Sequence, residues 1–404
     1  MKLKNLLVVV ASALLMLGFA EGALQVLEFP ARPASGWRWD ESPYRSPANS
    51  DDHRVNQLGL RGEPIAYAKD DFVILLVGDS QVEAGFQPHD RMPEALLRES
   101  MERRLGPGKV KVFSIASAGW GNDQQLVWLK RYFENYRADV VVNWLTPVND
   151  YWENTFIDRS VMRQAGRLKP TYRLEPGGEL SPAQAGSRSK LRSLVSLAIG
   201  RWRHGESYTL EQHSSDGWMA ALPAAQAPRP APPVCPALEI DQKTLIGSYR
   251  QGARAYTVVT DEDLARGRSH FAVFLKEESP RDRYAIDVTH RLLQEVARTA
   301  QSHGARFFLY HAYRNDLDAA FREIRCLKTG DGATFAFDGS DLLRYLKASP
   351  LAAHVVSAHI ASDHALNAGP NDWHLNEEGN RRAMDALANA LVGRVASPAA
   401  ASKP

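Results

Sequence analysis

Polar residues of the types used in acyl transfer follow several apolar runs of this chain. Ser80 ends the run of "VILLVGDS", Gly119 follows "VKVFSIASA", and Asn149 follows "DVVVNWLTPV". Asp372 and His374 stand in "PNDWHLNEEG", just before the last helical pattern. A hydroxyl, a backbone donor, an amide, an imidazole and a carboxylate are the parts of a serine nucleophile site. Each of these residues could also have an ordinary structural role, such as a turn or a cap. Their placement in the fold decides between the catalytic and the structural role.

Alternating elements are predicted to position these residues. Unbroken apolar runs predict buried strands, and helical spacing predicts helices between them. Such alternation favours a parallel sheet with helical crossovers, in which the carboxyl ends of the strands meet at one edge. The expected strands are Phe72–Val77, Val110–Ile115, Asp139–Leu145, Ala305–Tyr310 and residues 353–359, and the expected helices are Pro93–Leu105, Gln124–Tyr136, Tyr284–Gly304, Ser340–Ser349 and Leu375–Val392, the last with Asn376 as a possible cap.

The N-terminus is predicted to direct export. Lys2 and Lys4 precede the apolar run Leu6–Ala20, and apolar character continues to Phe29. Two interpretations remain open: a signal peptide cleaved after Ala20, or an uncleaved anchor of the roughly 20 residues that a bilayer requires. We favour the anchor. In either case the two lysines keep the N-terminus in the cytoplasm, and the bulk of the chain lies on the envelope or periplasmic side of the membrane.

Six regions divide the chain. Residues 1–29 form the signal segment, 30–69 an irregular lead-in expected to wrap the surface, and 70–158 the first part of the catalytic domain. Residues 159–280 form an insertion or cap, rich in Pro and Ala in part, 281–395 complete the domain, and 396–404 form a disordered tail. Export permits a disulfide between the only two cysteines, Cys235 and Cys326; two unrelated buried thiols are the alternative.

Composition excludes several classes. Lys and Arg number 49 against 47 Asp and Glu, and no basic tract occurs, so nucleic acid is not an expected partner. The chain has no Cys-x-x-Cys and no His-Glu-x-x-His, so we expect no catalytic metal and no cofactor. The Gly-x-Ser-x-Gly elbow is also absent.

Four segments in order resemble the SGNH hydrolases, also called GDSL esterases: "VGDSQVEAG", "ASAGWGNDQQ", "VNDYWEN" and "DWHLNEEGNRRA". The lead-in "NQLGLRGEPI" resembles a membrane-anchored bacterial branch of that family. The resemblance covers about residues 56–158 and 284–392 and says nothing of the insertion. It implies a three-layer α/β/α sandwich around a mainly parallel, five-stranded, flavodoxin-like sheet.

The resemblance also implies roles. Ser80 would be the nucleophile and His374 the general base, oriented by Asp372. The backbone N–H groups of Ser80 and Gly119 and the Asn149 amide would form the oxyanion hole. Many members have the acid three residues before the histidine, where this chain has Asn371, so Asp372 departs from the commoner spacing.

Three tryptophans lie beside these segments: Trp120, Trp152 and Trp373. They are weak candidates for stacking on a sugar ring, and core packing is the favoured alternative. Two functions remain. The first is an exported esterase or O-acyltransferase acting on acetylated envelope carbohydrate. The second is a catalytically idle carbohydrate-binding or polysaccharide-assembly subunit; a serine-reactive phosphonate separates the two.

Overall fold

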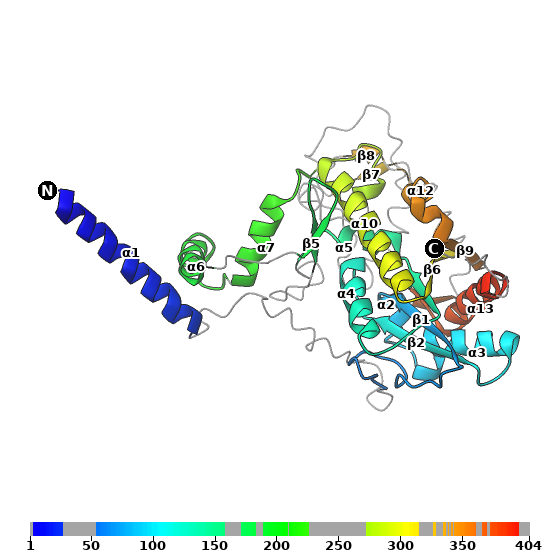
Figure 1. The fold of residues 1–404 in the computed structure, drawn as a ribbon. Coiled ribbons are helices and arrows are strands. Elements are labelled where there is room, and N and C mark those ends of the chain that lie inside the picture. Colours follow the sequence, from blue (N-terminus) through cyan, green and yellow to red (C-terminus); the bar gives the residue numbers. More distant parts are fainter. Residues whose placement is uncertain are drawn as a thin grey trace. The chain divides into compact units, whose positions relative to one another are not determined.

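The computed structural model describes residues 3–26, 54–157, 171–182, 189–208, 210–225, 272–314, 326–328, 334–336, 338, 341, 343–360, 366–369 and 372–395 (Figure 1). The chain forms two compact units. The helical unit comprises Met1–Trp39, Phe156–Pro170 and Pro182–Leu222, and the sheet unit comprises Asp40–Thr155, Thr171–Ser181 and Pro223–Pro404.

A five-stranded parallel sheet is the centre of the sheet unit. Its strands, in spatial order, are β2 (Val110–Ala116), β1 (Phe72–Gly78), β3 (Val140–Trp144), β6 (Arg306–Arg314) and β9 (Val355–Ile360). Every neighbouring pair is parallel. The predicted sandwich is confirmed, and all five expected strands are present. Numbered within this sheet, the order is 2-1-3-4-5, the flavodoxin-like order.

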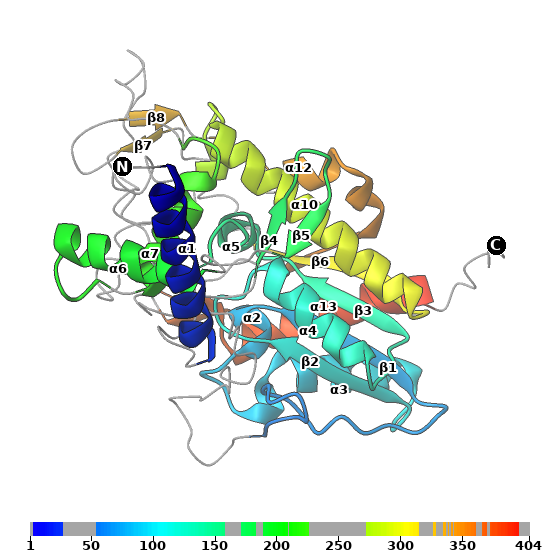
Figure 2. The same ribbon diagram turned by 60° about the vertical axis from the view of Figure 1, so that its left-hand side comes forward.

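Helices cover both faces of the sheet (Figures 1 and 2). α3 (Pro93–Leu105) and α13 (Glu377–Val395) pack together on one face, and α4 (Asn122–Phe133) and α10 (Pro280–Ser302) pack together on the other. One continuous apolar cluster joins the first pair to the strands; it includes Ile74, Val112, Val142, Leu97 and Leu387. The strands are mostly apolar because both faces are covered; Ser114 of β2 and Asn143 of β3 are buried polar exceptions.

The helix boundaries follow capping chemistry. α3 has the predicted bounds, with proline in its first turn. α10 begins four residues before the expected Tyr284, because Ser279 and Asp282 form a capping box around Pro280. α13 begins at Glu377 rather than Leu375, and the Asn376 side chain accepts a hydrogen bond from Gly379 N at 2.9 Å, so the predicted cap is confirmed.

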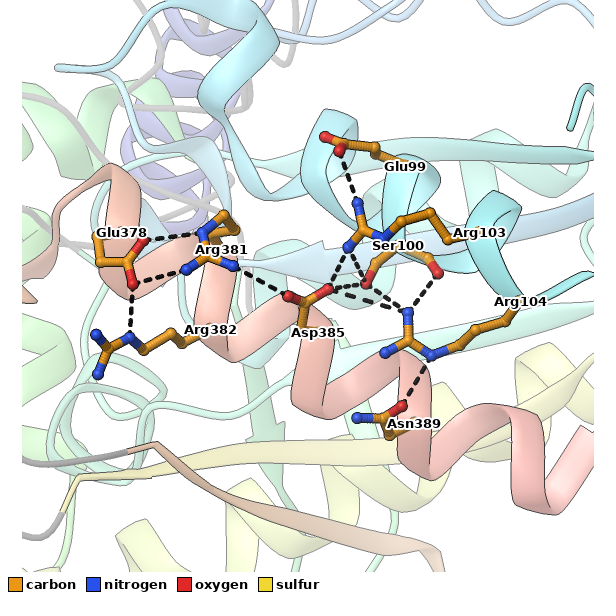
Figure 3. Close-up of polar contacts among 9 residues, drawn as sticks. All are labelled: Glu99, Ser100, Arg103, Arg104, Glu378, Arg381, Arg382, Asp385 and Asn389. Atoms are coloured by element: carbon orange, nitrogen blue, oxygen red, sulfur yellow. Dashed lines mark hydrogen bonds and ion pairs between the residues drawn. The ribbon is translucent and has the colours of Figure 1, made fainter.

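A seam of polar side chains joins α3 to α13 at the surface (Figure 3). Asp385 is its centre: it pairs with Arg103 at 2.5 Å and with Arg381 at 3.3 Å, and also hydrogen-bonds Ser100. Arg104 donates to Asn389 Oδ1 at 2.8 Å. These groups lie above the apolar cluster, on the solvent side of the two helices.

The described part of the lead-in, residues 54–69, is partly buried. Within residues 54–69, Asn56, Leu60, Arg61 and Ile65 are buried. Asn56 folds the segment on itself, since its Oδ1 accepts hydrogen bonds from Leu58 N and Leu60 N.

The helical unit contains α1 (Leu3–Val26), α6 (Lys190–His204) and α7 (Leu210–Ala221). The 23 residues Lys4–Val26 are long and apolar enough to cross a membrane, and none of their most apolar stretch is buried in the protein. A signal sequence meets the same criteria. The helix continues through Ala20, the expected cleavage position, without a break.

The described parts of the insertion are more regular than expected. Besides α6 and α7 they include a hairpin of β4 (Tyr172–Leu174) and β5 (Leu180–Pro182), which belongs to the sheet unit. Neither helix was predicted, because residues 155–280 carry little clear periodicity. The proline-rich residues 226–271 lie outside the described residues.

Candidate active site

The carboxyl ends of β1 and β3 lie side by side at the point where the strand order reverses. In open parallel sheets this is where ligands bind. β1 ends at Gly78 and delivers Asp79 and Ser80; β3 ends at Trp144 and leads to Asn149 in helix α5 (Pro147–Glu153). The polar residues expected after strands β1 and β3 therefore meet at this edge.

Ser80 and His374 are in hydrogen-bond contact. The Ser80 Oγ lies 2.7 Å from the His374 Nε2, across 294 positions of sequence. Both side chains are half-buried. Ser80 is the first residue of the short helix α2 (Ser80–Glu83), and His374 lies in β11 (Asp372–Leu375). At this distance a neutral imidazole can accept the hydroxyl proton.

Asp79, not Ser80, caps α2. Its Oδ1 accepts a hydrogen bond from Gln81 N at 2.9 Å. Asp79 is therefore a structural residue of this turn, and the Ser80 hydroxyl is left for other contacts. Gly78 permits the tight turn, because a Cβ there would lie 2.4 Å from the Val82 Cγ2.

Buried Arg61 holds the far end of α2. Its guanidinium donates to the carbonyl oxygens of Glu83 and Ala84, both at 2.7 Å, and also to that of Gln87. Ala84 has a φ of 45°, the only positive φ among the described residues other than glycine. Such a backbone is strained for an L-residue and persists only when its surroundings hold it. Arg61 supplies that restraint.

Gln87 links the nucleophile segment to the histidine strand. Its Nε2 donates to the Leu375 carbonyl oxygen at 2.7 Å, one residue after His374. The Phe86 ring meets the His374 ring edge-on, with centroids 5.4 Å apart. These two contacts hold the His374 imidazole in a fixed position relative to the loop after α2.

Asn149 points at Asp79. The Asn149 Nδ2 donates to the Asp79 Oδ2 at 3.1 Å. An amide nitrogen has two hydrogens, so this bond orients the group and leaves a second donor. Asn149 is the third residue of α5, so its alternative role as the cap of a following helix is wrong.

Asp150 lies behind this contact as a structural residue. Its Oδ2 accepts from Thr146 N at 2.7 Å and stabilises the start of α5. Burial, followed by the nearby Asp79 carboxylate, raises the pKa of Asp150 well above its usual range.

Gly119 occupies the turn after β2 with a φ of 70°, a left-handed backbone that glycine adopts without strain. The buried first turn of α4 follows it. There Asn122 and Asn143 of β3 both donate to the Gln125 Oε1, at 2.9 and 2.6 Å. Asn154 joins them through Asn122 at 3.0 Å. This amide network fixes the loop beneath the site.

The remaining candidates are less fully described. The backbone of Asp372 lies in β11, two positions before His374, and strand positions two apart share a face. The side chains of Asp372 and Trp373 lie outside the described part, as do Asn371 and Cys235. The orienting role of Asp372 and the Cys235–Cys326 pairing stay predictions.

Two tryptophans are turned away from solvent. Trp120 is 1% exposed and stacks on Trp128 with centroids 5.8 Å apart, and Trp152 is 3% exposed. Such burial favours the packing interpretation over sugar stacking for both. Within the described residues no group of three or more His, Cys, Asp or Glu side chains could hold a metal ion.

Sequence reasoning missed Arg61 and Gln87. The segment "NQLGLRGEPI" contained a signal, since a lone arginine between apolar residues in a turn-rich stretch indicates buried backbone contacts. Nothing local marked Gln87, whose partner is 288 residues away.

Comparison with known proteins adds little. No protein-family model matches the chain, and no curated protein does. Among solved structures, it is similar to LAE5, an alpha/beta hydrolase enzyme from the metagenome of Lake Arreo, Spain. The match has 13% identity and a TM-score of 0.26, and covers 80% of this chain and 95% of that one. A TM-score this low supports no conclusion, so function is argued from the site.

Proposed function

We propose that the protein is an exported, serine-dependent acyl esterase of the SGNH type. The contact between Ser80 Oγ and His374 Nε2 carries the proposal. It is supported by the placement of the pair at the switch point of the sheet and by the neighbouring Asn149 amide.

The reaction proceeds in two steps. His374 Nε2 takes the Ser80 proton as Oγ bonds to the ester carbonyl carbon, and the negative charge develops on the carbonyl oxygen. The N–H groups of Ser80 and Gly119 and the second hydrogen of Asn149 stabilise that oxyanion. As the C–O bond to the alcohol breaks, the imidazolium returns the proton to the leaving oxygen.

The acyl-enzyme is then resolved by the reverse sequence. His374 deprotonates a water molecule or an acceptor hydroxyl, which attacks the acyl carbon and releases Ser80 with its proton restored. Asp372 orients the imidazole. Because water and a sugar hydroxyl enter the same step, esterase and O-acyltransferase differ only in the acceptor.

Acetyl groups on envelope carbohydrate are the proposed substrate class. The support is the apolar N-terminal helix α1, which would hold the enzyme at the outer face of the membrane with Lys2 and Lys4 inside. No cofactor takes part in the proposed steps.

Hydrolysis of p-nitrophenyl acetate by the full chain in detergent tests the proposal. Ser80→Ala and His374→Ala should each remove most of the rate, up to about 10⁶-fold in the best serine enzymes and less on an activated ester. Asn149→Ala should lower kcat by about 10²–10³-fold, since one oxyanion donor is lost. Asp372→Ala should fall between these, and Asn371→Ala should change little.

Two control variants remove the same side-chain types, a serine and a histidine, outside the candidate site. Ser279→Ala removes a serine hydroxyl at the start of another helix, and His303→Ala removes an exposed imidazole; both should keep the rate. A fluorophosphonate should label wild-type protein and not Ser80→Ala. Full activity in Ser80→Ala would refute the proposal.

A further inference from the structure

Helix α6 of the helical unit exposes its large apolar side chains. Val195 is 58% exposed, Ile199 46% and Trp202 83%. Positions four and seven apart lie on one face of a helix, so these three form a stripe, here called the α6 stripe. A helix in contact with water alone would turn such a stripe inward.

The buried residues of α6, Lys190, Ser193 and Gly200, lie on the side away from the stripe. Ser193 is 8% exposed, and Gly200 lies against the Tyr208 ring so closely that a Cβ would be 2.2 Å from its Cε1. The Tyr208 hydroxyl in turn donates to Asp216 of α7 at 2.6 Å. The helix is therefore packed through the side that carries Lys190, Ser193 and Gly200, so the outward direction of the stripe is a feature of the packing.

Glu21 of α1 fixes the start of α6. Its carboxylate accepts hydrogen bonds from Lys190 N at 2.7 Å, Leu191 N at 2.9 Å and Ser189 Oγ at 3.0 Å. A carboxylate at free N–H groups of a helix start is favourable. In Figure 1, α6 is seen almost along its axis while α1 is seen from the side, so the two cross steeply.

The position of Glu21 along α1 indicates where the contact between α1 and α6 would lie in a bilayer. Seventeen residues separate Lys4 from Glu21, and at 1.5 Å per residue they span about 26 Å. The hydrocarbon core of a bilayer is about 30 Å thick. If α1 crosses a membrane, Glu21 lies near the far boundary, and α6 runs sideways from it.

We propose that α6 is an interfacial helix that lies in the outer surface of the same bilayer that α1 crosses. The α6 stripe enters the acyl region, Trp202 sits at the level of the headgroups, and exposed Arg192 and Arg203 beside the stripe meet phospholipid phosphates. α1 of the same unit also exposes large apolar side chains along its length, from Leu6 to Val26, which is why lipid is the occupant. The proposal requires an uncleaved α1 and is independent of the esterase activity.

Brominated lipids test the proposal. Intact mass first verifies that the full chain is present in proteoliposomes of phosphatidylcholine and phosphatidylglycerol. Subtracting the emission of Trp202→Phe from that of wild type isolates one of nine tryptophans. This difference should fall several-fold when the acyl chains are brominated. Trp218→Phe is the matched control: Trp218 is 5% exposed in α7, and its difference should change little.

A second variant tests the stripe itself. Val195→Glu puts a charge in the apolar region and should lift Trp202 out, which restores its emission in brominated lipid. If Trp202 is insensitive to bromine but quenched by acrylamide, the stripe faces water. If it is shielded from both quenchers, protein covers it. Either result overturns the proposal, while the rate on p-nitrophenyl acetate in Trp202→Phe, expected unchanged, reports separately on the enzyme.

Discussion

The α3–α13 seam and the amide network beneath the site are both rich in polar contacts, but water reaches only the first. Asp385 and Arg103 in the seam keep 27% and 48% of their side-chain surface exposed. Asn122, Gln125 and Asn154 near the site have none. When an exposed side chain loses its partner, water replaces the lost hydrogen bond. When a buried side chain loses its partner, no water is there to replace it.

The largest loss of stability is expected for Arg61→Met. Three carbonyl oxygens of the loop after α2 would lose their donor in a dry environment, at a cost on the order of 3 kcal/mol or more. Denaturant unfolding in detergent measures the loss. Arg54→Met is the control, since Arg54 is 55% exposed and pairs with Glu63 at 2.7 Å, and it should cost under about 1 kcal/mol. Equal losses would abolish the distinction between buried and exposed arginines.

Glu94 should make stability depend on pH. Burial is the main cause that raises its pKa to about 7, against 4.5 for the free group. The native state therefore retains a proton that the unfolded chain releases, so this contribution is complete below about pH 4.5 and is lost as the pH rises to about 7. The difference corresponds to roughly 3 kcal/mol.

Unfolding of wild type and Glu94→Gln between pH 4 and 8 tests this. The neutral variant should lack that loss, so its stability relative to wild type should rise across the window. Parallel curves for the two proteins would show that Glu94 ionises in the native state as it does in the unfolded chain.

Two asparagines then compare the regions directly. Asn154 accepts from Asp123 N at 3.2 Å and donates to Asn122 and Thr289. Asn154→Ala should cost about 2 kcal/mol, because these buried partners are left without it. Asn389→Ala removes the seam amide that accepts from Arg104 and should cost under about 0.5 kcal/mol. The two midpoints of denaturation measure both; a costlier Asn389→Ala would reverse the comparison.

A small, salt-dependent effect is expected for Asp385→Asn. It removes the charge shared by Arg103 and Arg381 but keeps an acceptor, and should cost about 0.5–1 kcal/mol. Raising the salt concentration to 1 M should reduce the difference from wild type, since exposed charges are screened. A salt-independent cost above about 2 kcal/mol would place the seam with the buried contacts.

Apolar runs and helical spacing predicted those elements whose residues pack into the core of the sheet unit. β1 and β3 were found from their unbroken apolar runs, and α3 from its proline and spacing. The start of α10 was missed although Ser279 and Asp282 carry a capping-box signature, and α6 was missed because its apolar residues face outward. The position of Asn149 within α5 also depended on the fold.

By itself the sequence determined the order of strands and helices and the residue types at the strand ends, because burial on both faces and capping act over a few neighbouring residues. Only the tertiary structure decided that Ser80 and His374 lie 2.7 Å apart, that Asn149 donates to Asp79, and that Arg61 and Gln87 brace the loop between them. These contacts join segments separated by up to 294 positions. Their geometry depends on how the sheet brings distant segments together, which no short stretch of sequence encodes.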